Sequence, residues 1–148
     1  VLAGEFLEAR AATKTFSEMM GAELRFAAGA TTEIELNPEF EYGFMLAAGQ
    51  LSVDGQTVPT SGLYFVPAGA DSVTLDAAAG SIVLMLGGKP FGEKILMWWN
   101  FIGRTQADVS KAREEWNAQS GERFGKFDDQ IGGWIPAPEL PNVQLSAR

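Results

Sequence analysis

Histidine and cysteine are both absent from this chain of 148 residues. Without cysteine the chain has no disulfide, no thiolate nucleophile and no thiolate metal ligand. Without histidine it has no imidazole ligand and no Ser-His pair for nucleophilic catalysis. We therefore expect no catalytic residue and no metal ligand of the usual kind in this chain.

Long apolar runs are missing as well. The longest, Ser81–Leu86, is far shorter than the roughly 20 residues that a membrane-spanning helix needs. No basic segment followed by an apolar one opens the chain, so no signal peptide is visible. These absences predict a cytoplasmic protein without membrane contact. The chain starts at Val1 without methionine, which leaves open that it is cut from a longer protein.

Basic residues are few, with 11 lysines and arginines against 19 acidic residues and a formal net charge of -8. Nucleic-acid affinity comes mostly from contacts between cations and phosphates, and the basic residues here are scattered. We expect no direct nucleic-acid binding and no basic patch for a membrane surface.

Glycine and proline, in contrast, are frequent, at 17 and 7 residues. They separate short segments that read as strands. Asp54-Gly55 is a hairpin signal, and the alternation around Val73 and Leu75 places both inward. Strands at this spacing predict an all-β jelly-roll sandwich or barrel. The expected strands are 22–26, 31–36, 42–48, 51–53, 62–66, 72–76, 81–86 and 95–102, with a further one at 1–6.

After Gly103 the pattern changes to a helix and a tail. Thr105 and Asp108 resemble a capping box, and Val109, Ala112 and Trp116 share one helical face. Ser120-Gly121 should end this helix. The rest, from residue 122, should be an extended proline-rich tail. We thus expect a β-barrel over 1–102 and a helix and tail over 103–148 that pack on the barrel or on a partner domain.

Two patterns suggest a ligand, and both have a simpler explanation. Glu33 with Glu35 and Glu39 with Glu41 alternate along strands, so a Mg²⁺ or Ca²⁺ site is conceivable, but a solvated strand face is the main expectation. Gly87–Gly92 is glycine-rich like a phosphate loop, yet it lacks the order of a P-loop. We expect a turn there.

The aromatic segment Met97–Phe101 has two interpretations. Adjacent tryptophans on a strand point to opposite faces, so one can fill the barrel while the helix, the tail or a partner covers the other. Core packing is the main expectation, and a protein interface is the alternative. The candidate interface residues are Trp98, Trp99, Asn100, Phe101, Trp116, Arg123 and Phe124.

Five motifs in this order resemble the pirin family, specifically its C-terminal cupin domain. They are Leu84–Glu93, Trp98–Phe101, the helix that carries Trp116, Glu122–Gly125 and Ile135–Pro141. The resemblance implies a two-domain cupin protein, or bicupin, whose N-terminal barrel holds iron through three histidines and a glutamate. It also implies a C-terminal barrel that is generally metal-free. The activities attached to the family are quercetin 2,3-dioxygenase activity and iron-dependent transcriptional coregulation.

This chain departs from the metal-binding pattern of a cupin barrel. Ser72 lies where the later histidine would fall, and the segment between Glu35 and Tyr42 holds no histidine pair. The resemblance therefore implies that iron belongs only to an N-terminal cupin domain outside this chain. No cofactor is expected in the chain itself.

We therefore expect a metal-free structural or interaction half of a pirin-like protein, with no enzyme activity of its own. Its expected partner is an N-terminal cupin half or a second copy of the chain in a homo-oligomer. Two alternatives stay open. The barrel contributes a wall to an iron dioxygenase site of the parent protein, or it binds a small ligand in its apolar interior.

Overall fold

The computed structural model describes residues 1–125 and 133–146. The chain forms two compact units, residues 1–90 and residues 91–148, and each is described by itself. Across the described residues, no helix is long and apolar enough to cross a membrane.

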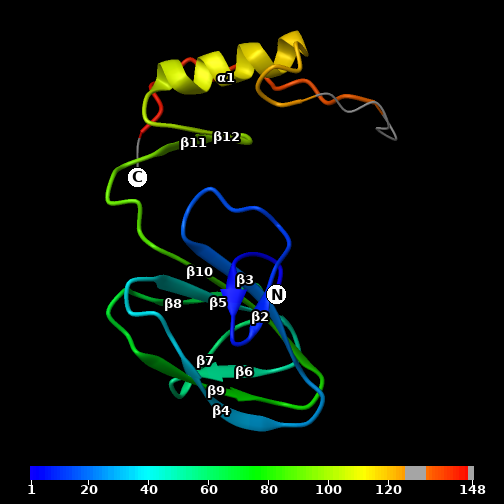
Figure 1. The fold of residues 1–148 in the computed structure, drawn as a ribbon, viewed down its shortest axis with the longest axis vertical. Coiled ribbons are helices and arrows are strands. Elements are labelled where there is room, and N and C mark those ends of the chain that lie inside the picture. The colour runs from blue at the N-terminus through cyan, green and yellow to red at the C-terminus, as the bar shows by residue number, and fades with distance from the viewer. Residues whose placement is uncertain (126–132, 147–148) are drawn as a thin grey trace. The chain divides into compact units, whose positions relative to one another are not determined.

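Two four-stranded antiparallel sheets make up most of the first unit (Figure 1). The chain passes from one sheet to the other at almost every connection between β3 and β10, which confirms the predicted all-β jelly-roll architecture. In sheet order, one sheet contains β3 (Met19–Phe26), β10 (Ser81–Gly88), β5 (Glu41–Ala48) and β8 (Leu63–Val66). The other contains β4 (Ala30–Glu35), β9 (Ser72–Ala77), β6 (Leu51–Val53) and β7 (Gln56–Thr57).

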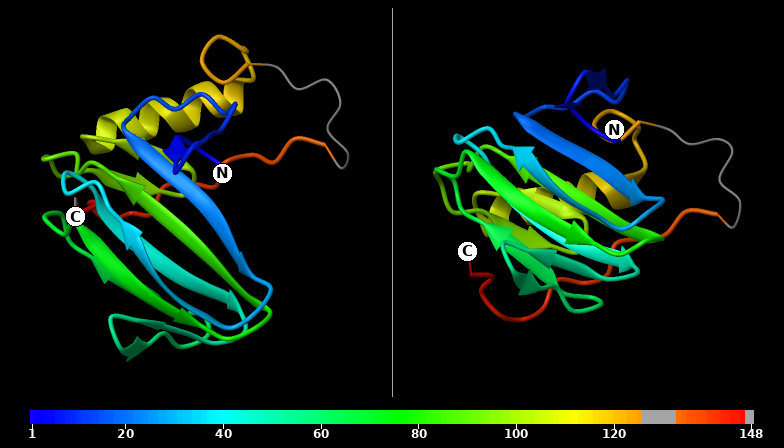
Figure 2. Two further views of the ribbon diagram at one scale, coloured as in Figure 1. Left: turned by 60° about the horizontal axis from the view of Figure 1, so that its bottom comes forward. Right: turned by 90° about the horizontal axis from the view of Figure 1, so that it is seen from below.

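The two sheets face each other across one apolar core (Figure 2). Because side chains alternate along a strand, every second residue points into this core. Val73 and Leu75 are 1% and 0% exposed, which confirms their predicted inward orientation. Phe44 from the opposite sheet is also 0% exposed. The predicted strand alternation therefore corresponds to the buried face of each sheet.

Two connections between strands depend on particular residues. Asp54 and Gly55 both have positive φ, 48° and 77°, as a two-residue hairpin turn of the type I′ class requires. Gly49, with φ of 86°, leads from β5 toward β6, and a Cβ there would clash with Ser81. Ser81 is buried, and its hydroxyl accepts from the Gln50 N–H at 3.0 Å and donates to the Gln50 carbonyl at 2.8 Å.

The first residues differ from the strand predicted over 1–6. Two short strands, β1 (Glu5–Phe6) and β2 (Ala9–Arg10), form a hairpin there. Ala3 makes an isolated antiparallel bridge to Gly21 of β3. The continuous strand is broken because Gly4 adopts φ of 61°, outside the extended region.

The second unit contains a hairpin of β11 (Leu96–Trp98) and β12 (Phe101–Gly103), then α1 (Gln106–Ala118). The predicted capping box is present, because the Thr105 side chain accepts from the Asp108 N–H and the Asp108 side chain accepts from the Thr105 N–H. Gln119 closes the helix in the left-handed conformation, just before the predicted stop.

The prediction of a single strand over 95–102 was wrong, because two strands lie there. Trp99 has φ of 52° and, with Asn100, forms the turn between β11 and β12. The resulting hairpin is a sheet of its own. It belongs to the compact unit that contains α1.

The described part of the tail, residues 133–146, has no helix or strand and runs along α1. The Ala137 N–H donates to the Asn117 side chain at 2.9 Å, and the Leu145 N–H donates to the Gln106 side chain at 3.2 Å. The remaining parts of the predicted tail, 126–132 and 147–148, lie outside the described residues.

Candidate functional site

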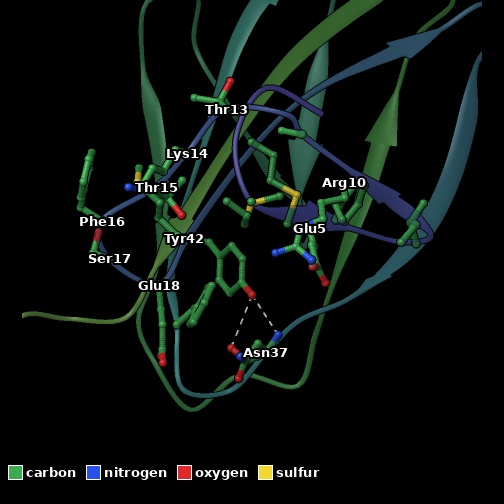
Figure 3. A pocket seen from close by; sticks show the side chains of 18 of the residues that line it. Glu5, Arg10, Thr13, Lys14, Thr15, Phe16, Ser17, Glu18, Asn37 and Tyr42 are labelled. Carbon is green, nitrogen blue, oxygen red and sulfur yellow. Dashed lines mark hydrogen bonds and ion pairs between the residues drawn. The ribbon is translucent and has the colours of Figure 1, made fainter.

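A bowl at one end of the sandwich is the first candidate site (Figure 3). Its volume is about 880 Å³, and one wall is the segment between Gly4 and Met20. The floor consists of core side chains from three neighbouring strands, Met20, Tyr42 and Met85, none more than 5% exposed. Two thioethers and a phenol are therefore the innermost groups that a ligand in the bowl would approach.

Tyr42, on β5, has the only hydroxyl among these three floor residues. Its hydroxyl accepts a hydrogen bond from the Asn37 N–H at 2.9 Å and lies 3.5 Å from the Asn37 carbonyl (Figure 3). Burial raises the pKa of Tyr42 above its ordinary value of 10.0, and the Asn37 hydrogen bond opposes this shift. The phenol is therefore neutral at physiological pH. It can donate or accept a hydrogen bond there, but it does not supply a base.

Several charged side chains in or beside the lining of the bowl form ion pairs. Arg10 lies 3.0 Å from Glu5. Lys89, beside the rim, lies 3.4 Å from Glu39 and 3.6 Å from Glu18. The hydrogen bond with Glu39, with the charge of Glu18, raises the pKa of Lys89 above its ordinary value. The lining itself also includes Lys14 and Glu35, so side chains of both signs face the bowl.

The residues of this barrel do not fit the iron site of a metal-binding cupin. The chain has no histidine, and the inward positions at the bowl hold Met20, Tyr42 and Met85. Ser72, at the position expected for a ligand, is exposed, and its hydroxyl donates to Glu33 at 2.7 Å. Within residues 1–125 and 133–146, no three acidic or imidazole side chains gather as a metal cluster.

The two pairs of alternating glutamates are exposed, which confirms the predicted solvated strand face. Glu33 and Glu35 lie on β4, on the outward side of the sheet. Among the described residues, they do not belong to a group of three or more side chains that could hold a metal ion. Glu39 precedes β5 and Glu41 begins it. All four glutamates lie on the surface, and Glu35 also lines the bowl.

The interior of the sandwich is filled by side chains. The largest ones with less than 2% exposure come from both sheets, so a ligand would occupy the bowl and not the interior between the sheets. In order of volume, the first of them are Phe44, Leu51, Leu75, Met85, Val53, Val73 and Val83.

The second unit gathers most of the candidate interface residues in one aromatic cluster. The ring of Trp99 lies edge-on to Phe101 at 5.2 Å and to Trp116 at 5.9 Å. Phe124 lies 5.5 Å from Trp116 and 5.9 Å from Phe101, and Trp98 lies 6.4 Å from Phe101. These separations are typical of packed aromatic pairs. The hairpin, α1 and the residues after it thus share one core.

Exposure separates the seven candidate residues into three groups. Phe101 is buried, Asn100 and Arg123 are exposed, and the remaining four aromatic residues are half-buried. Arg123 lies 3.0 Å from Glu115 and 5.2 Å from the centre of the Phe124 ring. The structure therefore places the aromatic residues in a common core, and their role in an interface stays a prediction.

Sequence reasoning missed two members of these regions. Trp134 stacks on Trp116 with ring centres 5.9 Å apart, and the Trp116 indole N–H donates to the Ile135 carbonyl at 2.9 Å. The sequence did offer one signal for a contact between the tail and the helix, the tryptophan that follows Gly133. Tyr42 was also missed, because its position within an apolar strand resembles that of any core residue.

Comparison with known proteins supplies the family context. The sequence profile of the Pirin C-terminal cupin domain matches residues 21–125. A Pseudomonas aeruginosa protein that bears the provisional name quercetin 2,3-dioxygenase is 35% identical over 141 residues, which cover 95% of this chain and 44% of that protein. A pirin-like protein of Caulobacter vibrioides is 28% identical over 140 residues, covering 94% of this chain and 46% of its own length.

Solved structures agree with these relatives. A crystal structure of quercetin 2,3-dioxygenase from Acinetobacter baumannii superposes with a TM-score of 0.83 at 37% identity, covering 99% of this chain and 48% of that one. A second such structure from the same organism gives a TM-score of 0.68 at 20% identity, covers 84% of this chain and 43% of that one, and supports the fold alone. The chain thus spans about half the length of the relatives it matches.

Proposed function

Because the chain belongs to the pirin family and matches its C-terminal cupin domain, we propose that it is the metal-free, structural half of a two-cupin protein. The observation that carries this proposal is that this cupin domain contains no histidine and no cysteine. The relatives that it matches are about twice as long. The role of this half is to pack against, and stabilise, a preceding cupin domain that binds iron. A second copy of the chain is the alternative partner.

Quercetin is the proposed substrate of the whole protein, because two of the similar proteins carry the name quercetin 2,3-dioxygenase. The iron and the reacting atoms would then belong to the preceding domain. The chain's own contribution is a rigid, filled sandwich, since its interior is occupied by side chains. A rigid neighbour can hold a site wall in place without touching the reacting atoms.

Metal analysis of the purified chain tests the proposal directly. The chain is loaded with ferrous iron, desalted, and measured for bound iron and for quercetin turnover. We expect far less than one iron per chain and no turnover, because the chain has no histidine and no cysteine to supply the usual ligands of an iron site. Stoichiometric iron accompanied by turnover would overturn the proposal. The Pseudomonas aeruginosa relative, treated in the same way, serves as the control for the assay.

The bowl favours a second candidate function, the binding of a small planar ligand. Thioether sulfurs make favourable contacts with aromatic rings, and Met20 and Met85 both line the floor beside the Tyr42 hydroxyl. Titration calorimetry of the chain with quercetin would detect such binding. Weakened binding in Tyr42→Phe would support the bowl, whereas no heat at millimolar ligand would rule this second candidate out.

A further inference from the structure

The outward face of the sheet β3–β10–β5–β8 is apolar along three of its four strands. Side chains that alternate with the core residues point away from the sandwich, and on this sheet they are large and hydrophobic. Leu63, Phe65 and Leu86 are 58%, 55% and 52% exposed. The outward apolar residues, which we call the apolar face, are Met45, Leu63, Phe65, Ile82, Leu84 and Leu86.

The register of the strands makes these residues neighbours. Met45 on β5 pairs with Leu63 on β8 and with Leu84 on β10. Gly43, one outward position away, pairs with Phe65 and with Leu86. Strands lie about 4.8 Å apart, so the apolar face extends roughly 10 Å across three strands. A contiguous exposed patch of this kind typically marks an interaction surface.

Charged residues limit the apolar face on its β3 side. Glu23 and Arg25 occupy outward positions on β3, and their side chains form an ion pair at 2.6 Å. Glu23 is directly opposite Leu84 in the register. An apolar centre with a polar rim is the usual anatomy of a protein–protein interface.

The start of the chain lies against the same sheet. The N–H groups of Leu2 and Ala3 approach the Gly21 carbonyl at 2.7 and 3.2 Å, and the Gly21 N–H donates to Ala3 at 2.9 Å. Gly21 occupies an outward position on β3 opposite Leu86. Any polypeptide joined to Val1 would therefore leave the domain at the edge of the apolar face.

The lengths of the relatives indicate what such a polypeptide is. This chain matches a C-terminal domain profile and covers only 44% and 46% of two curated relatives. The rest of each is large enough for another domain of similar size. Its attachment at the β3 edge gives it a high effective concentration at the apolar face.

From these observations we infer that the apolar face, centred on Leu63, Phe65 and Leu86, is the docking surface for the preceding cupin domain of the two-cupin protein. The inference rests on the proposed function and assigns that function to one surface. The partner presents a complementary apolar surface, because the face offers no charge at its centre. Phe65 and Leu86 are the expected anchors, since each is large and more than half exposed, and they flank Gly43 in the register.

A cleavable chimera tests the inference. The part of the Pseudomonas aeruginosa relative that precedes its matched segment is joined to Val1 through a linker with a protease site. After cleavage, sedimentation velocity at decreasing concentrations measures whether the two halves remain together. The relative's own two halves, cut at the same place, serve as the reference.

Lysine substitutions then locate the surface. We expect Phe65→Lys and Leu86→Lys each to weaken association by about 30-fold or more, as is typical when an interface anchor is lost. Thr74→Lys is the matched control, because Thr74 is exposed on the outward side of the opposite sheet. It should leave association unchanged. Circular dichroism and thermal unfolding of each isolated variant confirm that the fold is retained.

Hydroxyl-radical footprinting provides a measurement that needs no variant. Phe65 and Met45 should be labelled in the isolated chain and protected in the uncleaved chimera. Equal labelling in the two forms, or association that survives both lysine substitutions, would overturn the inference while the proposed function stands. Separation of the unmodified halves after cleavage would instead contradict the proposed function itself. Protection already present in the isolated monomer would also overturn the inference.

Discussion

The two sheets of the sandwich bury similar inward faces and expose very different outward ones. On the sheet β4–β9–β6–β7 the outward positions hold threonine, serine, aspartate and glutamate, and they bond to one another. Thr31 donates to Asp76 at 3.3 Å, and Ser72 donates to Glu33 at 2.7 Å. On the other sheet the outward positions hold the apolar face.

This difference separates what the fold needs from what the surroundings of the domain need. An inward apolar row on each sheet is enough to form the core, so the outward row is free to suit water or a partner. The polar sheet suits water. The apolar face adds nothing to the shared core, which is why we assign it to a partner domain.

The largest expected effect is on the free energy of unfolding, and it differs between a leucine that points into the core and one that points outward. Leu75, on the inward side of β9, is 0% exposed, and Leu86, on the outward side of β10, is 52% exposed. Leu75→Ala should lower the free energy of unfolding of the isolated chain by about 2–5 kcal/mol, because it leaves a cavity in the core. Leu86→Ala should cost less than about 1 kcal/mol.

Urea denaturation of the isolated chain, followed by circular dichroism, measures both values. Leu75→Val is a useful intermediate, since it removes only part of the same side chain. Equal losses for Leu75→Ala and Leu86→Ala would show that the apolar face is already buried in the isolated chain, and the comparison between the two outward faces would fail.

How much of this was predictable from the sequence depends on the range of the signal. The turn at Asp54-Gly55 and the capping box at Thr105 are local, and both were predicted correctly. The Ser72–Ala77 strand alternates so regularly that its inward residues could be named. The apolar face could not be located, because strands such as Leu63–Val66 are apolar on both sides and the sequence does not show which side is covered.

At the aromatic hairpin β11–β12, the sequence predicted one strand where the structure has a turn. Its turn consists of Trp99 and Asn100, without glycine or proline, so no local signal interrupted the expected strand. The left-handed backbone of Trp99 accompanies its packing against Phe101 and Trp116. The contact with Trp116 is distant in sequence and could not be inferred from local patterns.

An intermediate effect on the free energy of unfolding is expected for Tyr42, which lies on the inward side of the sheet that carries the apolar face. Tyr42→Phe removes the hydroxyl that accepts from the Asn37 N–H and should cost about 1 kcal/mol at neutral pH. Since burial raises the pKa of the folded phenol, the unfolded chain loses its proton first, near its ordinary pKa of about 10. The stability contributed by the neutral Tyr42 is therefore complete below that pH and is lost as the pH rises through the folded pKa.

Unfolding measured from pH 8 to about pH 11 distinguishes this effect from other titrations. The wild-type chain should lose more stability above pH 10 than Tyr42→Phe, so the difference between them should shrink or reverse. Lysines titrate equally in both proteins and cancel in the comparison. A constant difference across this range would show that the folded phenol titrates normally.

The smallest expected effect is on the outward side of the polar sheet. Thr31→Val removes the hydroxyl that donates to Asp76, but both residues are exposed and water can replace the hydrogen bond. The free energy of unfolding should change by no more than about 0.5 kcal/mol, and the β-branched shape that suits a strand is retained.

Urea denaturation measures this change, and Leu86→Thr, the reciprocal polar change on the apolar face, is measured beside it. In the isolated chain both variants should unfold close to the wild type, and only Leu86→Thr should weaken association in the cleaved chimera. A loss above about 1 kcal/mol for Thr31→Val would mean that the hydrogen bonds of the polar sheet support the fold and are not simply a hydrated surface.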